Sequence, residues 1–196
     1  ERYAPGVTPD TPLHGWSMTK SAINALVGVM VRDGRLTMDA PAPVPEWADP
    51  ADPRRAITPD DMLRMRTGLA LGDTSNASAN TALDPSARAM FVERDMAGFA
   101  ARARLSGQPG KTFAYADGET LILSRILRDL AGGDAAHVHA FMRRELFGPL
   151  GMDSAVMELD SVGTPLGGSH LYASARDWAK LGLLYANDGV VGGRRI

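Results

Sequence analysis

Cysteine is absent from the 196-residue chain, which excludes a disulfide framework, a thiolate zinc site and a cysteine nucleophile. Long apolar runs are also absent, so no segment has the length of a membrane span. Charge of one sign is not concentrated anywhere: the formal net charge is −2, without the basic stripe that nucleic-acid binding needs. These absences leave an ordinary compact domain as the expected class.

What the sequence does contain is helical periodicity, which predicts a single, mostly helical domain. Residues 1–15 are expected to be coil, and few convincing strands are present, Thr112–Tyr115 being a short extended piece. The proline-dense segment after Leu36 fits either a surface connection anchored by Trp47 or a disordered linker. Residues 72–86 are expected to form a long loop. Helices are expected over residues 17–32, 58–67, 96–103, 118–131, 135–147 and 174–188.

A serine followed three residues later by a lysine opens the first of these helices. Ser17 and Lys20 share a helix face, so the hydroxyl and the amine can meet. The field at a helix start disfavours a protonated lysine, and burial acts in the same direction, so Lys20 is expected to serve as a neutral base for a nucleophilic Ser17. A solvated lysine beside a helix-start serine fits the same four residues, so the pattern alone does not decide.

The sequence argues against three other kinds of site: a phosphate-binding loop, a histidine metal site and a G-x-S-x-G hydrolase site. Residues 107–112 end like a phosphate-binding loop, but a leucine stands where the first glycine belongs and Pro109 removes a backbone donor. His137 and His139 are two residues apart, which on a helix points them in different directions, so no metal site is expected. Residues 15–19 lack the closing glycine of the G-x-S-x-G hydrolases.

Tyr115 and Asp117 form the second candidate group. They lie two residues apart on an extended piece, so both side chains can point to the same side. A tyrosine beside a lysine ionises more easily and can shuttle a proton between nucleophile and leaving group. A core aromatic remains the alternative for Tyr115, and the N-cap of the following helix remains the alternative for Asp117.

The Ser17–Lys20 element before a helix, with residues 109–117 much later, resembles the serine β-lactamase and penicillin-binding-protein superfamily. It is most similar to the branch that holds class C β-lactamases, esterases of that fold and 6-aminohexanoate-dimer hydrolases. Residues 60–69, 147–152 and 167–189 match this branch as well, so the resemblance covers nearly the whole chain. It implies an α+β fold of the β-lactamase/transpeptidase type.

The resemblance also implies roles for the candidate residues. Ser17 would be the acylated nucleophile, Lys20 its proton acceptor, and Tyr115 the tyrosine that protonates the leaving group and activates water. Asp117 would bind substrate at a position that usually holds asparagine. An ionised carboxylate can only accept hydrogen bonds, which favours ester or amide hydrolysis over β-lactam recognition. No metal or organic cofactor is implied.

The third element of the superfamily, a K-T-G-like or H-x-G-like strand, does not follow Tyr115. Arg66-Thr67-Gly68 precedes Tyr115 and reads as a helix end. The chain is therefore expected to be one truncated domain over residues 1–196, mostly the helical lobe with the flanking sheet strands missing. The oxyanion hole would combine the N–H of Ser17 with a donor on the missing strand.

The sequence thus predicts a serine hydrolase that cleaves an ester or amide bond, with a β-lactam as a further option, through an acyl-enzyme on Ser17. The expected partner is a small-molecule ester, amide or peptide-like substrate. One alternative stays open: a non-catalytic or slowly turning-over penicillin-binding or sensor module on the same fold. The resemblance suggests a periplasmic or secreted protein, although no targeting segment supports this.

Overall fold

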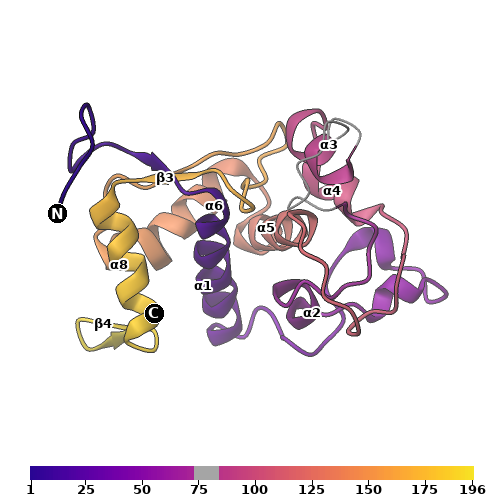
Figure 1. The fold of residues 1–196 in the computed structure, drawn as a ribbon. Helices are drawn as coiled ribbons and strands as arrows, with labels where there is room; N and C mark the ends of the chain where they lie inside the picture. Colours follow the sequence, from indigo (N-terminus) through magenta and orange to yellow (C-terminus); the bar gives the residue numbers. More distant parts are fainter. Residues whose placement is uncertain (73–83) are drawn as a thin grey trace.

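The buried helix α5 (Gly118–Ala131) lies at the centre of the structure (Figure 1). The structure is a computed structural model that describes residues 1–72 and 84–196. All residues of α5 from Gly118 to Leu127 are buried, because this helix is surrounded by other helices. It packs against α1 (Thr19–Arg32), α2 (Pro59–Leu63), α4 (Met96–Ala101) and α6 (Ala135–Met142).

Helix α1 ends at the residue that the helical period predicts, Arg32, but begins two residues later than expected, at Thr19. Its buried face carries Ile23, Leu26, Val27 and Met30, each 1% exposed or less, at the spacing of one helix face. A 3₁₀ turn, η1 (Trp16–Met18), precedes it, so Ser17 lies just before the α-helix. The predicted helix is therefore confirmed, and its first turn is tighter than expected.

A small antiparallel sheet lies beside the start of α1. Its order is β1 (Leu13–His14), β3 (Leu171–Ala173) and β2 (Val156–Met157), with Leu13 opposite Ala173 and Met157 opposite Leu171. The prediction of coil for residues 1–15 is wrong at β1. A two-residue strand that pairs with a distant segment leaves no local pattern in the sequence.

The proline-dense segment is ordered by 3₁₀ turns rather than by long helices. Both η2 (Pro45–Trp47) and η3 (Pro53–Ala56) begin with a proline, which suits the first position of a helical turn. Trp47 is 1% exposed, and its Nε1 donates to the carbonyl of Ala101 at 2.8 Å. The anchored surface connection is confirmed, and the disordered linker is not what the structure shows.

The remaining helices follow the predictions with three differences. Helix α2 ends at Leu63, although the prediction extended it to residue 67, because the chain turns at Met65 with a φ of +52°. Helix α3 (Pro85–Phe91) was not expected and begins inside the predicted loop, of which residues 73–83 lie outside the described part of the chain. The helix predicted over 135–147 continues from α6 into a π-helical segment, η5 (Arg143–Phe147), and then α7 (Gly148–Leu150). The chain closes with α8 (Ala175–Ala186) and the hairpin β4 (Val190–Val191) and β5 (Arg194–Arg195).

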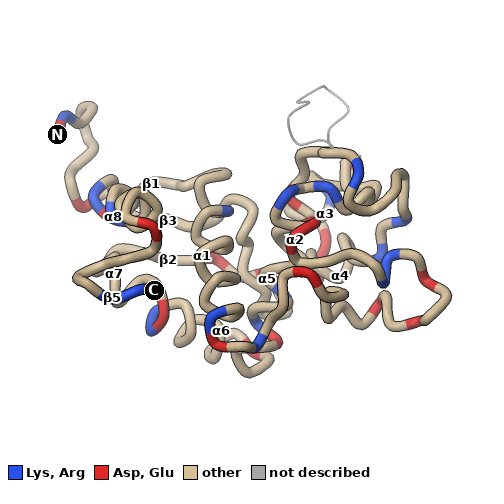
Figure 2. Tube along the Cα trace, turned by 90° about the horizontal axis from the view of Figure 1, so that it is seen from below, with Lys and Arg blue, Asp and Glu red and all other residues tan. Residues whose placement is uncertain are grey.

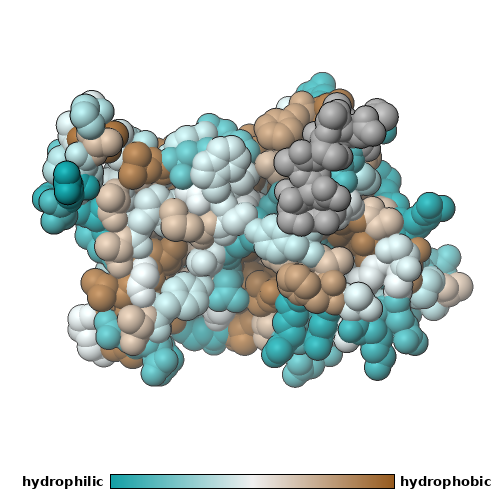
Figure 3. Space-filling model, viewed as in Figure 1, coloured by the Kyte–Doolittle hydropathy of each residue, from teal (hydrophilic) through white to brown (hydrophobic). Residues whose placement is uncertain are grey.

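The surface mixes charges and polarity. Figure 2 shows lysine and arginine residues interspersed with aspartate and glutamate along the trace. Figure 3 shows hydrophilic and hydrophobic side chains side by side over the visible face. Within residues 1–72 and 84–196, no helix combines the length and the apolar character needed to cross a membrane.

Candidate active site

The turn that presents Ser17 is held by a close contact at Gly15. The Gly15 N–H donates to the carbonyl of Leu171 at 2.9 Å, and a Cβ at this position would lie 2.2 Å from a ring carbon of Trp178. Trp16 follows with φ of +46°, a backbone conformation that non-glycine residues rarely adopt. The chain therefore bends sharply between β1 and α1, and Ser17 is exposed at the end of the helix.

Three of the predicted residues meet at this point. The hydroxyl of Tyr115 lies 2.6 Å from Ser17 Oγ, and Lys20 Nζ lies 3.3 Å from the same oxygen. Lys20 Nζ is also 5.2 Å from the centre of the Tyr115 ring. Tyr115 is thus no core aromatic, and Lys20 does not extend into solvent.

Lys20 is held by acceptors from three parts of the chain. Besides Ser17, its ammonium donates to Asp117 Oδ1 and, at 2.7 Å, to the carbonyl of Gly168. These acceptors match the three donors of a protonated lysine. The side chains of Lys20 and Asp117 are only 13% and 8% exposed. With its donors engaged in this way, Lys20 is placed as a hydrogen-bond donor to Asp117, Gly168 and Ser17 and not as the base that the helix position alone suggested.

Asp117 occupies the N-cap position of α5 but makes no capping hydrogen bond with its side chain. Its carboxylate is turned to Lys20 instead, in a setting where the residue is 6% exposed. Gly168 allows this approach, because a Cβ there would lie 2.7 Å from Asp117 Oδ1. The predicted contact of Asp117 with a substrate stays a prediction.

The backbone around Tyr115 is held by the turn after α2, which we call the support turn (Met65–Leu69). The N–H of Ala114 donates to the carbonyl of Met65 at 2.9 Å, and that of Gly110 donates to Arg66 at 2.8 Å. Residues 112–115 belong to no strand. The Arg66-Thr67-Gly68 tripeptide therefore supports the segment that carries Tyr115, and it is no sheet strand.

Glu119 is a buried acid beside the site that the sequence did not single out. The residue is 2% exposed, Oε1 accepts a hydrogen bond from Thr67 Oγ1 at 3.0 Å, and Oε2 has no partner. Burial raises the pKa of Glu119 to about 7. A glutamate in the first turn of a helix is a common surface feature, so no local pattern indicates that Glu119 is buried.

The histidines contribute no metal cluster. Among the described residues, no group of three or more histidine, aspartate or glutamate side chains could hold a metal ion. His137 contacts Asp134 at 2.9 Å on the surface. His170 follows Ser169, whose hydroxyl lies 2.6 Å from the ring Nδ1, and burial together with nearby His14 lowers the pKa of His170.

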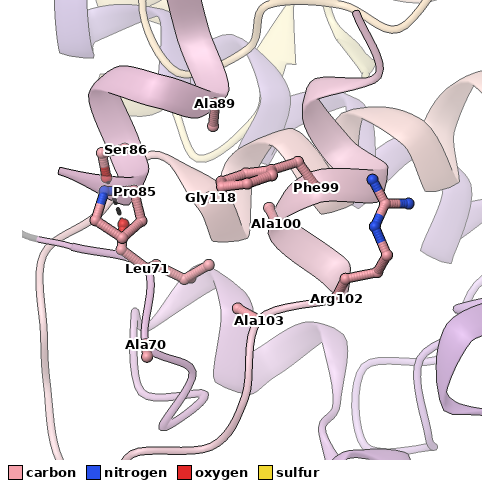
Figure 4. A pocket seen from close by; sticks show the side chains of 10 residues that line it. All are labelled: Ala70, Leu71, Pro85, Ser86, Ala89, Phe99, Ala100, Arg102, Ala103 and Gly118. Atoms are coloured by element: carbon pink, nitrogen blue, oxygen red, sulfur yellow. Dashed lines mark hydrogen bonds between the residues drawn. The ribbon is translucent and has the colours of Figure 1, made fainter. Parts of the chain in front are cut away.

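A separate apolar cavity of about 240 Å³ lies between α3, α4 and the start of α5 (Figure 4). Leu71 and Phe99 point into it, and Ser86 closes one side by donating from Oγ to the carbonyl of Leu71 at 2.7 Å. None of the three residues that meet at Ser17 lines this cavity. The chemically active groups therefore lie outside it.

The sequence profile of the family described as Beta-lactamase matches residues 1–195. The chain belongs to the beta-lactamase family. The α+β fold predicted from the resemblance is confirmed. Comparison with curated proteins gave no significant match.

Solved structures of low sequence identity share the fold. A Bacillus anthracis protein assigned as a 6-aminohexanoate-dimer hydrolase superposes with a TM-score of 0.80 at 20% identity, over 99% of this chain and 52% of that one. A penicillin-binding protein homologue from Caulobacter crescentus gives 0.70 at 18% identity, over 99% and 60%. The D-amino acid amidase of Ochrobactrum anthropi SV3, in complex with L-phenylalanine amide, gives 0.64 at 20% identity, over 93% and 59%. The chain thus spans about half the length of these structures.

Proposed function

We propose that this chain carries the acyl-enzyme centre of a serine hydrolase that cleaves ester or amide bonds. One observation carries the proposal: Ser17 Oγ lies 2.6 Å from the Tyr115 hydroxyl and 3.3 Å from Lys20 Nζ. A nucleophile within hydrogen-bonding reach of a proton carrier, which is itself next to a fixed charge, is the arrangement that nucleophilic catalysis needs.

The ion pair supports Tyr115, rather than Lys20, as the group that transfers protons. Charged Lys20 stabilises the phenolate that accepts the proton of Ser17. Ser17 Oγ then attacks the carbonyl carbon, and the Ser17 N–H is proposed as one donor to the oxyanion. Tyr115 returns the proton to the leaving oxygen or nitrogen as its bond to carbon breaks. Water then attacks the acyl carbon while Tyr115 takes its proton, and Tyr115 returns that proton to Ser17 Oγ as the bond between carbon and Oγ breaks.

Substrates with an ester or an amide bond suit this site better than β-lactams. The proteins assigned as 6-aminohexanoate-dimer hydrolase and D-amino acid amidase share the fold. Asp117 stands where the resemblance expects an asparagine, and its carboxylate is engaged by Lys20. It offers no N–H to a substrate carbonyl. We therefore propose small esters, amides or peptide-like molecules as substrates.

A fluorophosphonate probe tests the proposal on the full-length protein. We expect one covalent adduct, located on Ser17 by mass spectrometry and lost in Ser17→Ala. Ser21→Ala is the matched control, because Ser21 is an exposed serine one turn further along α1. Absence of an adduct on Ser17 in the folded protein would contradict the hydrolase proposal.

The ion pair also supports a second candidate, a sensor that is acylated without turnover. With its three donors engaged by Ser17, Asp117 and Gly168, Lys20 cannot act as a second base for water, so release of the acyl group would depend on Tyr115 alone. A chromogenic ester separates the two candidates. A burst of one equivalent followed by no steady-state release would favour the sensor, whereas continued release would favour the hydrolase.

A further inference from the structure

Glu119 is a fully buried acid that the proposed reaction does not use. It lies in the first turn of α5, two residues after Asp117. One carboxyl oxygen accepts from Thr67 Oγ1 at 3.0 Å, while the other has no partner. Thr67 is itself 0% exposed. A buried carboxylate with a free oxygen is costly, so this environment favours the protonated form.

The Thr67–Glu119 hydrogen bond joins the two elements that fix Tyr115. On one side, the support turn holds the backbone of Ala114 through Met65. On the other side, Tyr115 leads through Asp117 directly into α5. Thr67 belongs to the support turn and Glu119 to α5, so their hydrogen bond links the two elements on either side of the Tyr115 backbone.

Two charges act on the Glu119 carboxyl. Asp117, at the start of the same helix, raises its pKa further, and Lys20, from α1, acts in the opposite direction. An ionised Glu119 would therefore place a second negative charge beside the Lys20–Asp117 ion pair. That charge would offset the positive field of Lys20 on which the proposed Tyr115 phenolate depends.

We propose that Glu119 is a positioning residue for the Ser17 centre: in its uncharged form it joins α5 to the support turn and leaves Asp117 as the anion that pairs with Lys20. Ionisation of Glu119 lowers the reactivity of Ser17. The inference rests on the proposed function, since it describes how the same centre is controlled.

The test measures the rate of fluorophosphonate labelling of Ser17 in the full-length protein between pH 6 and pH 8. The neutral fraction of an acid with a pKa of about 7 falls about tenfold over this interval. We therefore expect the ratio of the wild-type rate to the Glu119→Gln rate to fall about tenfold, because the amide cannot ionise. Parallel pH profiles in the two proteins would overturn the inference.

Thr67→Val supplies a signature that a purely structural role does not produce. The valine keeps the shape but removes the hydrogen bond that stabilises ionised Glu119, so the fall in rate moves to higher pH. Glu158→Gln is the matched control, since Glu158 is exposed, and its profile is expected to follow the wild type. An unshifted Thr67→Val profile counts against the inference.

Failure of the two proposals can be told apart. No label on Ser17 at any pH contradicts the hydrolase, whereas label with parallel profiles contradicts only the role of Glu119. Thermal unfolding decides the state of Glu119 without labelling. The difference in melting temperature between Glu119→Gln and the wild type should grow from pH 5 to pH 8, and a constant difference would overturn the inference.

Discussion

Tyr115 is the residue whose single oxygen carries most of the proposed chemistry. Its hydroxyl contacts Ser17 Oγ at 2.6 Å, and general acid–base groups typically contribute about 10²–10⁴-fold to a rate. We expect Tyr115→Phe to slow fluorophosphonate labelling of Ser17 by about 100-fold or more, with the melting temperature nearly unchanged. Tyr3→Phe, near the N-terminus, should label like the wild type. Equal labelling in Tyr115→Phe would show that Tyr115 is not the proton carrier.

The Lys20–Asp117 ion pair makes a prediction about stability. Removing one partner of a buried pair leaves the other charge uncompensated, at a cost of about 3–5 kcal/mol in typical cases. Asp117→Asn should therefore lower the free energy of unfolding, by about 3 kcal/mol since Gly168 still accepts from Lys20. Urea unfolding measures this. Asp153→Asn is the control, because Asp153 is 86% exposed and such pairs contribute little; a similar small loss in both variants would refute the prediction.

At the scale of elements, the bend between β1 and α1 depends on the absence of a side chain at Gly15. A Cβ would lie 2.2 Å from Trp178, so Gly15→Ala forces α8 or the bend to move. Overpacking of this kind costs about 1–3 kcal/mol, and we expect labelling of Ser17 to fall as well because the bend positions it.

Gly28 offers a matched substitution within α1. A Cβ there meets nothing within 4 Å, and alanine in a helix interior is more favourable than glycine by about 0.5–1 kcal/mol. Gly28→Ala should therefore stabilise the protein in the same urea experiment. Stabilisation by Gly15→Ala would mean that the bend is not under steric constraint.

Most helices could be predicted because their signals are local. The apolar period locates α1 and α5, and the capping residues Thr58 and Ser174 mark two helix starts, where each side chain accepts from a backbone N–H. The strand β1 and the π-helical segment η5 could not be predicted. Strand β1 depends on pairing with a distant strand. The segment η5 continues directly from α6, and its apolar residues show no change of period that would distinguish a π-helix from an α-helix.

The candidate site was predictable to a similar degree. Ser17 and Lys20 share a helix face, so their spacing is a local signal. That Asp117 pairs with Lys20, and that Glu119 is buried, depend on how α1 and α5 pack, which no short stretch of sequence records. The contact between Lys20 and Gly168, 148 positions apart, has the same origin.

At the scale of the whole molecule, opposing pKa shifts define a pH range of maximum stability. A hydrogen bond from Arg144 lowers the pKa of Glu145, and two hydrogen bonds from Arg125 lower the pKa of Glu46 against the effect of burial. Stability from these carboxylates is present above their ordinary pKa and is lost as the pH falls through the lowered value. Glu119 is shifted from 4.5 to about 7, so the folded state binds the extra proton, and stability falls as the pH rises through this interval.

We therefore expect the free energy of unfolding to be greatest near the ordinary pKa of Glu119, 4.5, and to decline as the pH rises toward 8. The shift of Glu119 corresponds to about 3 kcal/mol as an upper value. Glu119→Gln should remove the alkaline decline and leave the acidic one. Denaturant unfolding from pH 3 to pH 9 measures the loss of stability at both low and high pH. If the loss at high pH persists in Glu119→Gln, it does not arise from Glu119.

The three acceptors around one lysine nitrogen also have a consequence for biosynthesis. Ser17 is translated before Asp117 and Gly168, which lie about 100 and 150 positions further along the chain. During synthesis the proposed nucleophile therefore lacks one of the acceptors that hold Lys20 until Gly168 has left the ribosome. Contacts of such long sequence separation form slowly, so we expect Ser17 of the nascent chain to stay unreactive while most of the helices can already form.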